Sequence, residues 1–361
     1  MDSLDWGRIV PLIGPAAGAL AGYDSLIAQM QNPNVLLAPL LTQESVLSSK
    51  IEGTNVTMGE ALEIEAGGGG DVEQSKRDDA EEVLNYRAAL RFASAALRER
   101  PFSLHLLREA HAILLDGVRG RDKGPGAFRD EQNWIGPRGC AIEQASFVPI
   151  PQEHLLSGLE VWAAYFADNS PLDPLVQLAV IHFEFEAIHP FKDGNGRLGR
   201  MLIPLFLMER GILSSPSFYM SGYLEARREE YVDKMLAVSR DGAWTDWCVF
   251  FLEGIIQQAR QNQRKAQAIL NLYRDMMQHR MADLIHSQYS GLAVDFLFSH
   301  PVFSSRDFVK NSGVPQMTAQ RIIRLLRDAD ILRIVRESAG SRPAVYAFPD
   351  ILNIAEGEEV F

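Results

Sequence analysis

One stretch of the chain, from His189 to Arg200, gathers side chains that suit chemistry on phosphate groups. It reads His-Pro-Phe-Lys-Asp-Gly-Asn-Gly-Arg-Leu-Gly-Arg. An unperturbed histidine has a pKa of about 6.5, so a neutral His189 near pH 7 can accept a proton. Asp193 supplies a hard oxygen ligand of the kind that Mg²⁺ prefers. The stretch therefore combines a candidate base with a candidate metal ligand.

The remaining residues of the stretch suit an anion. Gly194 and Gly196 permit left-handed backbone angles and the close approach of an oxygen-rich ligand. The amide of Asn195 can donate to a phosphate oxygen. Arg197 and Arg200 keep their charge and can bind phosphate through two hydrogen bonds each. These residue types in this order indicate phosphate binding.

Two helices must position these groups. Residues Pro174–Ile188 form an apolar run that predicts a buried helix, and Pro190 should end it near His189. A second helix is expected over Leu198–Arg210, stopped by Gly211. The stretch is then a loop that leads into a helix N-terminus, where free N–H groups and the helix dipole favour an anion.

Three other interpretations compete. Gly194 to Gly199 also fits the G-x-G-x-x-G pattern of dinucleotide-binding domains, but that pattern needs a preceding strand and βαβ units, which this sequence lacks. His182, Glu186 and His189 share one helix face and could ligate zinc, although no fourth ligand is evident. A purely structural turn explains the glycines but not the concentration of His, Asp, Asn and Arg.

The composition narrows the class of protein. The chain has 361 residues, of which 47% are hydrophobic and 23% charged, as expected for a soluble globular protein of two or three domains. Its formal charge of −12 argues against general binding to nucleic acid or anionic membranes. With Cys140 and Cys248 as the two cysteines, no disulfide framework is expected and a cytoplasmic location is the default. We find no signal pattern and no apolar run of about eighteen residues, so we expect no membrane segment.

The stretch fills every fixed position of the signature H-P-F-x-D/E-G-N-G-R-x-x-R, so the chain resembles the Fic (Fic/DOC) family. The resemblance implies a protein adenylyltransferase, which transfers AMP from ATP to a Ser, Thr or Tyr hydroxyl of a protein and releases pyrophosphate. It implies that His189 is the catalytic base and that Asp193 holds Mg²⁺. Tyr231, on a helix expected over Ser221–Arg240, is a candidate adenosine contact, with a buried core tyrosine as the alternative. The implied phosphate-binding residues are Gly194, Asn195, Gly196, Arg197, Leu198, Gly199 and Arg200.

A second segment resembles the family's inhibitory motif S/T-x-x-x-E-G/N. Ser48, Glu52 and Gly53 fill its fixed positions. The implied role is that Glu52 forms a salt bridge with Arg200 and holds ATP in an unproductive pose. Some relatives run the reverse reaction, in which this glutamate helps to activate water and AMP is removed, and this stays open as an alternative.

Residues Pro137–Pro151 alternate short apolar pieces with proline ends and predict a hairpin. By resemblance this is the flap, whose edge docks the target protein by strand addition, with Ile142, Phe147 and Val148 as docking residues. An ordinary surface hairpin is the alternative.

From Gly291 onward the order of helices and strands resembles a winged helix. Arg321, Arg324 and Arg327 are spaced three apart on its third helix and could contact DNA. From Gly291 to Asp350, eight Lys and Arg stand against six Asp and Glu, which is a weak excess for a DNA-binding module. Packing or protein contact is the alternative use of this domain.

The sequence therefore predicts a mostly α protein, with a helical Fic core, a small β-hairpin flap and a C-terminal winged helix-turn-helix domain. Thr42 should cap the inhibitory helix, and Pro11, Pro15, Pro33 and Pro39 should break the other residues up to 65 into short pieces. The expected partners are ATP, Mg²⁺ and an unidentified protein target, with self-modification, a homodimer and DNA also considered. The expected divisions are 1–95 (N-terminal region, with the inhibitory helix at about 42–53), 96–254 (catalytic core), 255–290 (connecting helix) and 291–361 (winged helix).

Overall fold

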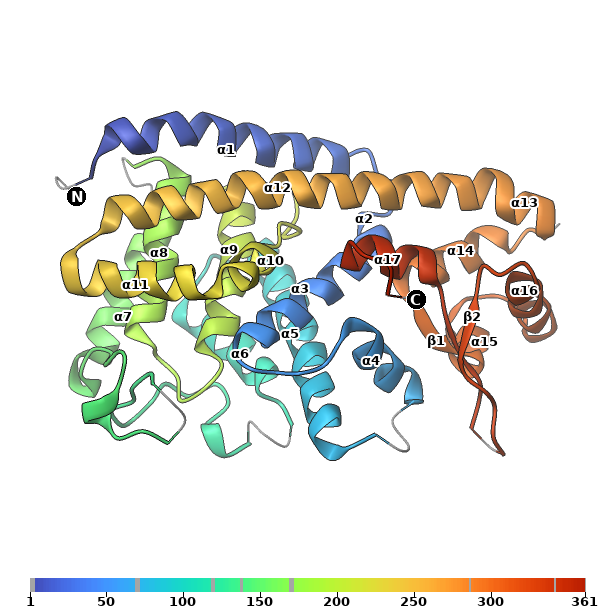
Figure 1. The fold of residues 1–361 in the computed structure, drawn as a ribbon, viewed down its shortest axis with the longest axis horizontal. Helices are drawn as coiled ribbons and strands as arrows, with labels where there is room; N and C mark the ends of the chain where they lie inside the picture. Colours follow the sequence, from blue (N-terminus) through green and yellow to red (C-terminus); the bar gives the residue numbers. More distant parts are fainter. Residues whose placement is uncertain are drawn as a thin grey trace. The chain divides into compact units, whose positions relative to one another are not determined.

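The computed structural model describes residues 4–68, 72–117, 121–136, 139–168, 172–285, 287–340 and 342–360. In these ranges the chain is mostly helical, with one small sheet (Figure 1). The strands are β1 (Val302–Ser304), β2 (Arg333–Arg336) and β3 (Val345–Ala347). The α-helices are α1 (Trp6–Ile27), α2 (Pro33–Leu36), α3 (Ala38–Ile51), α4 (Met58–Glu63), α5 (Gln74–Glu99), α6 (Leu104–Leu114), α7 (Leu155–Ala167), α8 (Pro174–Ile188), α9 (Asn195–Glu209), α10 (Ser221–Ala226), α11 (Arg228–Asp241), α12 (Trp244–Asp275), α13 (Met281–Leu284), α14 (Ser290–Ser299), α15 (Ser305–Asn311), α16 (Gln316–Asp328) and α17 (Pro349–Glu356).

The chain divides into two compact units, each built from segments that lie far apart in the sequence. This division by contacts does not test the four successive regions expected from the sequence, and those regions stay a prediction. Unit 1 contains Met1–Gly22, Leu47–Gly53 and Asn85–Arg260, and unit 2 contains Tyr23–Val46, Thr54–Leu84 and Gln261–Phe361.

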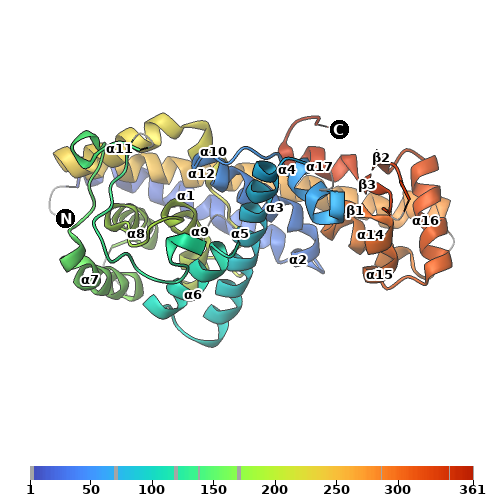
Figure 2. The same cartoon turned by 90° about the horizontal axis from the view of Figure 1, so that it is seen from below.

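Helix α8 is the central helix of unit 1. Asp173 caps its first turn, and α7 and α9 pack against it (Figure 2). Two buried tryptophans hold it from neighbouring helices. Trp162 of α7 donates to the Ile181 carbonyl oxygen at 3.0 Å, and Trp247 of α12 donates to the Ala179 carbonyl oxygen at 2.8 Å. These contacts fix the position of α8 and therefore of the loop at its end.

The loop between α8 and α9 is bounded by two left-handed residues. His189 has a φ of 50° and Gly194 has a φ of 77°. Gly194 adopts this angle at little cost, whereas His189 must be held there by its surroundings. Helix α8 has the predicted bounds, but α9 begins at Asn195, before the predicted start at Leu198.

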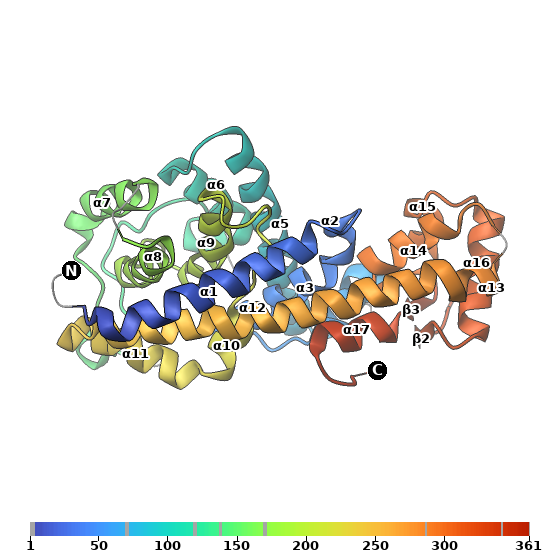
Figure 3. The ribbon, with the colours of Figure 1, turned by 90° about the horizontal axis from the view of Figure 1, so that it is seen from above.

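Helix α1 contradicts the prediction that prolines break the N-terminal region. It is one continuous helix of 22 residues that contains Pro11 and Pro15. Both prolines are exposed, so the carbonyl groups that lose an intrahelical partner can bond to water. Within unit 1 the start of α1 lies beside the start of α12, where Arg8 and Asp246 form an ion pair at 2.8 Å (Figure 3).

Among the described residues, α1 is also the helix long and apolar enough to cross a membrane by length and composition. Its most apolar window has a mean hydropathy of 1.2, and 28% of that window is buried. One such helix is weak evidence, because core helices and signal sequences meet the same criterion. The expectation of no membrane segment stays a prediction.

Helix α3 starts earlier than predicted. Thr42 is not its N-cap, because α3 begins at Ala38 and the Thr42 hydroxyl donates to the Ala38 carbonyl oxygen at 3.1 Å. Helix α3 ends at Ile51, close to the end of the predicted range of about 42–53, and Gly53 follows with a φ of 99°, a backbone angle that favours glycine. Glu52 therefore lies just beyond the last turn of α3.

The flap is less regular than the predicted hairpin over 137–151. In its described residues it has one antiparallel bridge, between Ile135 and Phe147, and a 3-10 turn at Ile142–Gln144. Pro149 and Pro151 lack an N–H group and cannot extend the ladder of hydrogen bonds. Pro137 and Arg138 lie outside the described residues.

In unit 2, helices α14, α15 and α16 are followed by strands β2 and β3, and the short strand β1 lies between α14 and α15. The sheet has the order β1-β3-β2 and is antiparallel, with Phe303 and Ile334 on either side of Tyr346. Ser304 caps α15 through reciprocal hydrogen bonds with Asp307. Strand β1 and helix α17 were not predicted. Ser341, in the predicted turn between the last strands, lies outside the described residues.

Candidate active site

The loop from His189 to Gly194 is held by side chains that bond to its backbone. The Asn195 side chain accepts from the Phe191 N–H at 2.9 Å and donates to the Phe191 carbonyl oxygen at 2.8 Å. Arg129 and Asn133 donate to the carbonyl oxygen of His189 at 3.1 and 3.3 Å. These bonds hold the left-handed turn at His189 in place.

His111 is a further support that sequence reasoning missed. Its ring stacks on Phe191 with centroids 3.6 Å apart. Burial lowers the pKa of His111 to about 4, so the ring is neutral at pH 7. Its Nδ1 accepts from the Gly126 N–H at 2.9 Å and its Nε2 donates to the Asp193 carbonyl oxygen at 3.0 Å. A lone histidine on an amphipathic helix gives no signal by which this role could be predicted.

His189 has the properties of a neutral base. Its Nδ1 lies 3.3 Å from the Glu186 carbonyl oxygen, to which it can only donate, and this leaves a lone pair on Nε2. Burial lowers the pKa of His189 and the charge of Arg129 lowers it further, which outweighs the opposite effects of Glu52 and Asp193. The ring can therefore take up a proton at Nε2 near neutral pH.

The predicted phosphate-binding residues lie at the N-terminus of α9. The first N–H groups of a helix have no partner within it, and no side-chain cap bonds to them here, because the N-cap residue is Gly194. The Asp193 carboxylate accepts from the Gly194 N–H at 2.6 Å and lies 3.5 Å from the Arg197 guanidinium, with 46% of its side chain exposed. Gly196 is needed here, because a Cβ at this position would lie 2.1 Å from Oε1 of Glu52.

Three of the predicted phosphate-binding residues make contacts within the protein that were not expected from the sequence. The Asn195 amide is used inside the loop, so at most its backbone N–H faces an anion. Leu198 is a core residue with 1% exposure. The Gly199 carbonyl oxygen accepts from Nδ1 of His182 at 3.2 Å, and this glycine packs against Glu186. Because successive helical residues point in different directions, not every residue of a helical motif can face one ligand.

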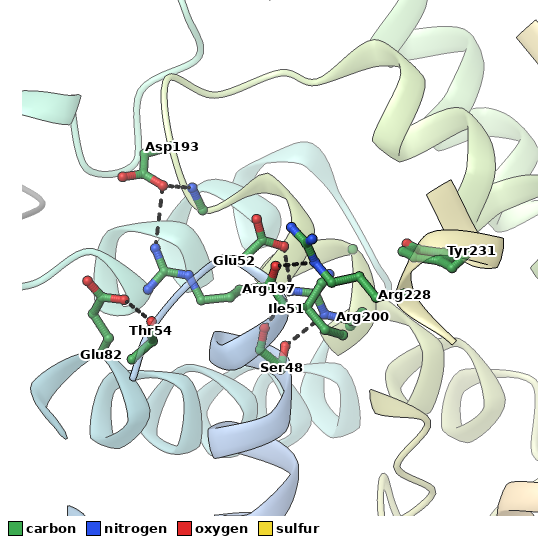
Figure 4. Close-up of polar contacts among 12 residues, drawn as sticks. Ser48, Ile51, Glu52, Thr54, Glu82, Asp193, Arg197, Arg200, Arg228 and Tyr231 are labelled. Atoms are coloured by element: carbon green, nitrogen blue, oxygen red, sulfur yellow. Dashed lines mark hydrogen bonds and ion pairs between the residues drawn. The ribbon is translucent and has the colours of Figure 1, made fainter. Parts of the chain in front are cut away.

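Arg200 is buried and already paired. Its side chain is 2% exposed, and it donates from Nη2 to Oε1 of Glu52 at 2.7 Å (Figure 4). It also donates to Oγ and the carbonyl oxygen of Ser48 at 3.0 and 2.8 Å. Burial alone would raise the pKa of Glu52, but the charges of Arg200 and Arg197 outweigh it and hold the pKa below its usual range. The predicted contact between Glu52 and Arg200 is therefore present as a charged pair.

The end of α3 is also held by α10 and α11. Arg228 donates to the Ile51 carbonyl oxygen at 3.0 Å (Figure 4). Lys50 forms an ion pair with Glu225 at 2.8 Å. The segment that carries Glu52 is thus fixed by two further contacts besides Arg200, and neither was predicted from the sequence.

Tyr231 is a core residue rather than a candidate adenosine contact. It is 3% exposed, and its hydroxyl lies 2.8 Å from Nε2 of His182. Because His182 donates from Nδ1 to Gly199, its Nε2 can accept this hydroxyl proton. Both nitrogens of His182 are then occupied. Among the described residues, no group of three or more His, Cys, Asp or Glu is arranged to hold a metal ion, so the zinc interpretation finds no support.

An apolar cavity of about 120 Å³ lies between the flap, α8 and α11. Phe147 of the flap lines it, whereas Ile142 and Val148 are exposed, at 36% and 46%. Val232, next to Tyr231, is on its wall. The lining residues are Ile135, Ser146, Phe147, Phe183, Glu186, Ala187, Val232, Met235, Leu236 and Ser239.

Two protein-family models match the chain. The model described as Fic/DOC family N-terminal matches residues 10–95, and the Fic/DOC family model matches residues 101–207. Together the matches cover more than half of the chain and include α8, the loop and all of α9 except its last two residues. The chain belongs to the Fic/DOC family. The dinucleotide-binding interpretation is wrong, since a helix and not a strand precedes the loop.

Curated members of the family are similar over part of the chain. A protein adenylyltransferase of Caenorhabditis briggsae is 29% identical over 163 residues, 45% of this chain and 30% of that protein. A probable protein adenylyltransferase of Aquifex aeolicus is 30% identical over 118 residues, 30% of this chain and 37% of that protein. The matches thus span about a third of these relatives.

Solved Fic structures share the fold. A Fic family protein from Desulfovibrio desulfuricans superposes with a TM-score of 0.60 and 18% identity, covering 94% of this chain and 95% of the other. Fic-1 of Caenorhabditis elegans superposes with a TM-score of 0.55 and 19% identity, covering 71% of each chain. The mostly helical Fic fold predicted from the sequence is confirmed.

Ser48 and Ser49 provide a matched test of the hydrogen bond between the Ser48 hydroxyl and Arg200. Ser48→Ala removes a hydrogen bond to a buried cation and should lower the free energy of unfolding by about 1.5–3 kcal/mol. The buried Ser49 hydroxyl has no hydrogen-bond partner among the described residues, so Ser49→Ala should be close to neutral. Trp6, Trp134, Trp162, Trp244 and Trp247 all lie in unit 1, so tryptophan fluorescence during urea unfolding reports on this unit. Equal losses in the two variants would contradict the assigned contact.

Proposed function

We propose that this chain is a protein adenylyltransferase that moves AMP from ATP to a Ser, Thr or Tyr hydroxyl of a protein. The observation that carries the proposal is the placement of a neutral His189 next to the N-terminus of α9, with buried Arg197 and Arg200 on the same helix. The names of the related proteins given above support the same activity.

In the proposed reaction, His189 and the start of α9 act on opposite sides of the reacting phosphorus. The target hydroxyl gives its proton to Nε2 of His189 while its oxygen attacks the α-phosphorus, and the bond to the β-phosphate oxygen breaks. The N–H groups of the first turn of α9 and Arg197 stabilise the charge that develops on the phosphate oxygens. Pyrophosphate leaves, and the proton passes from His189 to solvent.

Asp193 fits a magnesium ion held jointly with the nucleotide. It is a single, partly exposed carboxylate at the edge of the anion site, which suits a metal that takes its remaining ligands from phosphate and water. When bound, Mg²⁺ would neutralise charge on the leaving pyrophosphate. Asp193 would hold the ion, while His111 and Asn195 hold the backbone that carries Asp193.

The apolar cavity beside the loop suits the base of the nucleotide. Glu186 and Ala187 line it and lie three and two positions before His189, so a ligand with its phosphates at α9 can place a flat ring there. The exposed Ile142 and Val148 remain available to the target protein at the edge of the flap, whereas Phe147 faces the cavity.

We further propose that Glu52 inhibits the enzyme. Its carboxylate occupies Arg200, which would otherwise bind the γ-phosphate, and it lies against Gly196 in the anion site. Glu52 also lies near His189, whose pKa it raises, and a carboxylate in this place could help to activate water. Removal of AMP, with Glu52 in that role, is the alternative use of the same site.

Transfer of label distinguishes the proposed reaction from phosphorylation. Incubation of the Glu52→Gly chain with ATP labelled in the α-phosphate should label protein, including the chain itself, and ATP labelled in the γ-phosphate should not. His189→Ala should reduce labelling by at least about a thousandfold, because the base is lost. His154→Ala, which changes an exposed histidine, is the control and should have no effect. Label from the γ-phosphate would make the chain a kinase.

Release of inhibition is tested at Glu52. Glu52→Gly should raise self-modification at least about tenfold, which corresponds to about 1.4 kcal/mol, because Arg200 becomes available to the nucleotide. Glu52→Gln keeps an oxygen for Arg200 but no charge, and its activity should lie between the two. The readout is the intact mass after incubation with ATP and Mg²⁺. An unchanged rate in Glu52→Gly would remove the inhibitory role.

A second proposed function is DNA binding by residues 291–361, which we take to be a winged helix. Arg321, Arg324 and Arg327 are all exposed on α16, which supports a basic contact face. The chain should then shift duplex DNA in a salt-dependent manner, and changing all three arginines to alanine should weaken binding at least about tenfold. Equal binding without them would contradict the proposal. The homodimer and the cytoplasmic location stay predictions.

A further inference from the structure

One short segment, residues 129–133, holds the backbone of the loop that carries His189. The Arg129 N–H donates to the Pro190 carbonyl oxygen at 2.9 Å, and its Nε donates to the His189 carbonyl oxygen at 3.1 Å. Asn133 donates from Nδ2 to the Phe191 carbonyl oxygen at 3.1 Å. Three consecutive carbonyl groups of the loop are therefore bonded to this segment.

The side chain of Arg129 also joins the two arms of the flap, which we define as residues 131–135 (outgoing arm) and 147–150 (returning arm). Its Nη1 donates to the Glu131 carbonyl oxygen at 3.1 Å. Its Nη2 donates to the Ile150 carbonyl oxygen at 2.5 Å. One guanidinium group thus bonds to the loop and to both arms of the flap.

The charge of Arg129 has no counter-ion among the described residues. The residue is 2% exposed, and its side-chain hydrogen bonds go to carbonyl oxygens. Burial of a cation without an anion costs free energy, and a neutral side chain of similar volume would cost less. The charge does act on His189, whose pKa it lowers. Stability alone therefore does not explain an arginine at this position.

The geometry of these bonds links the flap to the base. A guanidinium group is planar and rigid, so its three bonds keep fixed directions relative to one another. A shift of either arm would move the guanidinium group, and with it the His189 carbonyl oxygen. His189 is sensitive to such a shift, because its left-handed backbone angle must be held by its neighbours.

We infer that Arg129 is a positioning residue that couples the flap to His189. A target protein docked on the flap then helps to set the direction of the base that removes its proton. Among the described residues, Arg129 forms no hydrogen bond or ion pair with α9, so nucleotide binding there should not depend on it. This inference rests on the proposed adenylyltransferase function.

Three variants of the Glu52→Gly chain separate the bonds of Arg129 from its charge. Arg129→Met removes both. Arg129→Lys keeps the charge, but its donors sit on one atom and cannot reach three carbonyl groups in different directions. Gln132→Ala is the matched control, because Gln132 donates to the Pro149 carbonyl oxygen of the returning arm at 3.1 Å and bonds to no residue of the loop. If Arg129→Met fails to fold, Arg129→Lys decides.

The first readout is the rate of self-modification at saturating ATP, together with the ATP concentration that gives half this rate. Both Arg129 variants should lower the saturated rate at least about tenfold, because the base is misplaced. The half-saturating concentration should stay within about threefold, because α9 is intact. Gln132→Ala should keep both values within about threefold. A raised ATP requirement at an unchanged saturated rate would overturn the inference, as would Arg129 variants that are as fast as Gln132→Ala.

The pH dependence separates position from charge. The rate should fall as the pH drops through the pKa of His189, because only the neutral ring takes up a proton. The charged groups that act on this ring are Arg129, Asp193 and Glu52, and Glu52 is absent from the parent chain used here. Arg129→Lys should keep the acidic limb of the profile in place, whereas Arg129→Met should move it to higher pH. A parent-like rate in Arg129→Lys would contradict the inference, because the charge alone would then matter.

Hydrogen exchange followed by mass spectrometry tests the coupling without any reaction. In Arg129→Lys, peptides that cover residues 187–196 and the two arms should exchange faster together, whereas in Gln132→Ala faster exchange should stay within the arms. Unchanged exchange of residues 187–196 in Arg129→Lys would overturn the inference. If the parent chain labels no protein, the proposed function fails, and exchange still decides whether Arg129 joins the flap to His189.

Discussion

A buried guanidinium that cannot lose its charge is the constraint on which the site depends. Arg200 is 2% exposed, and burial of an unpaired charge costs several kcal/mol. An anion must therefore lie beside it at all times. In this structure the anion is Glu52, which comes from a segment about 150 positions away in the sequence. The same requirement that holds α3 in place would let a phosphate take the place of the Glu52 carboxylate in the proposed reaction.

The loop before α9 meets a second constraint. In the proposed reaction, a base at the end of α8 and an anion site at the start of α9 must lie a few ångströms apart, which requires a tight connection between the two helices. The left-handed turns at His189 and Gly194 solve this by reversing the chain within six residues. Asn195, Arg129 and His111 support this turn with hydrogen bonds to its backbone, so the conformation does not depend on a ligand. Such pre-organisation is what electrostatic catalysis requires.

Much of this could be predicted from the sequence, because the loop residues are adjacent and carry distinct chemistry. The bounds of α8, the end of α3 and the contact between Glu52 and Arg200 were correct. Features that depend on packing could not be predicted from the sequence. Tyr231 and its neighbour Val232 differ by one helical position, and only the packing around α11 shows which of them faces the cavity. Pro11 and Pro15 were expected to break a helix, but their solvent exposure keeps α1 continuous.

The support of the site by distant residues was equally hidden. Arg228, Lys50 and His111 carry no local motif, and their partners are set by the tertiary fold. The sequence could not show the enclosed position of Glu186 either, since it depends on the missing side chain of Gly199. Arg228 and Lys50 hold the end of α3, and His111 holds the loop before α9.

The most direct test of the central claim is a crystal structure of the Glu52→Gly chain with a non-hydrolysable ATP analogue and Mg²⁺. The terminal phosphate should lie within hydrogen-bond distance of the Arg200 guanidinium, in the place that the Glu52 carboxylate leaves, with the α-phosphate facing Nε2 of His189. A bound nucleotide whose phosphates lie away from Arg200 and from the first turn of α9 would contradict it.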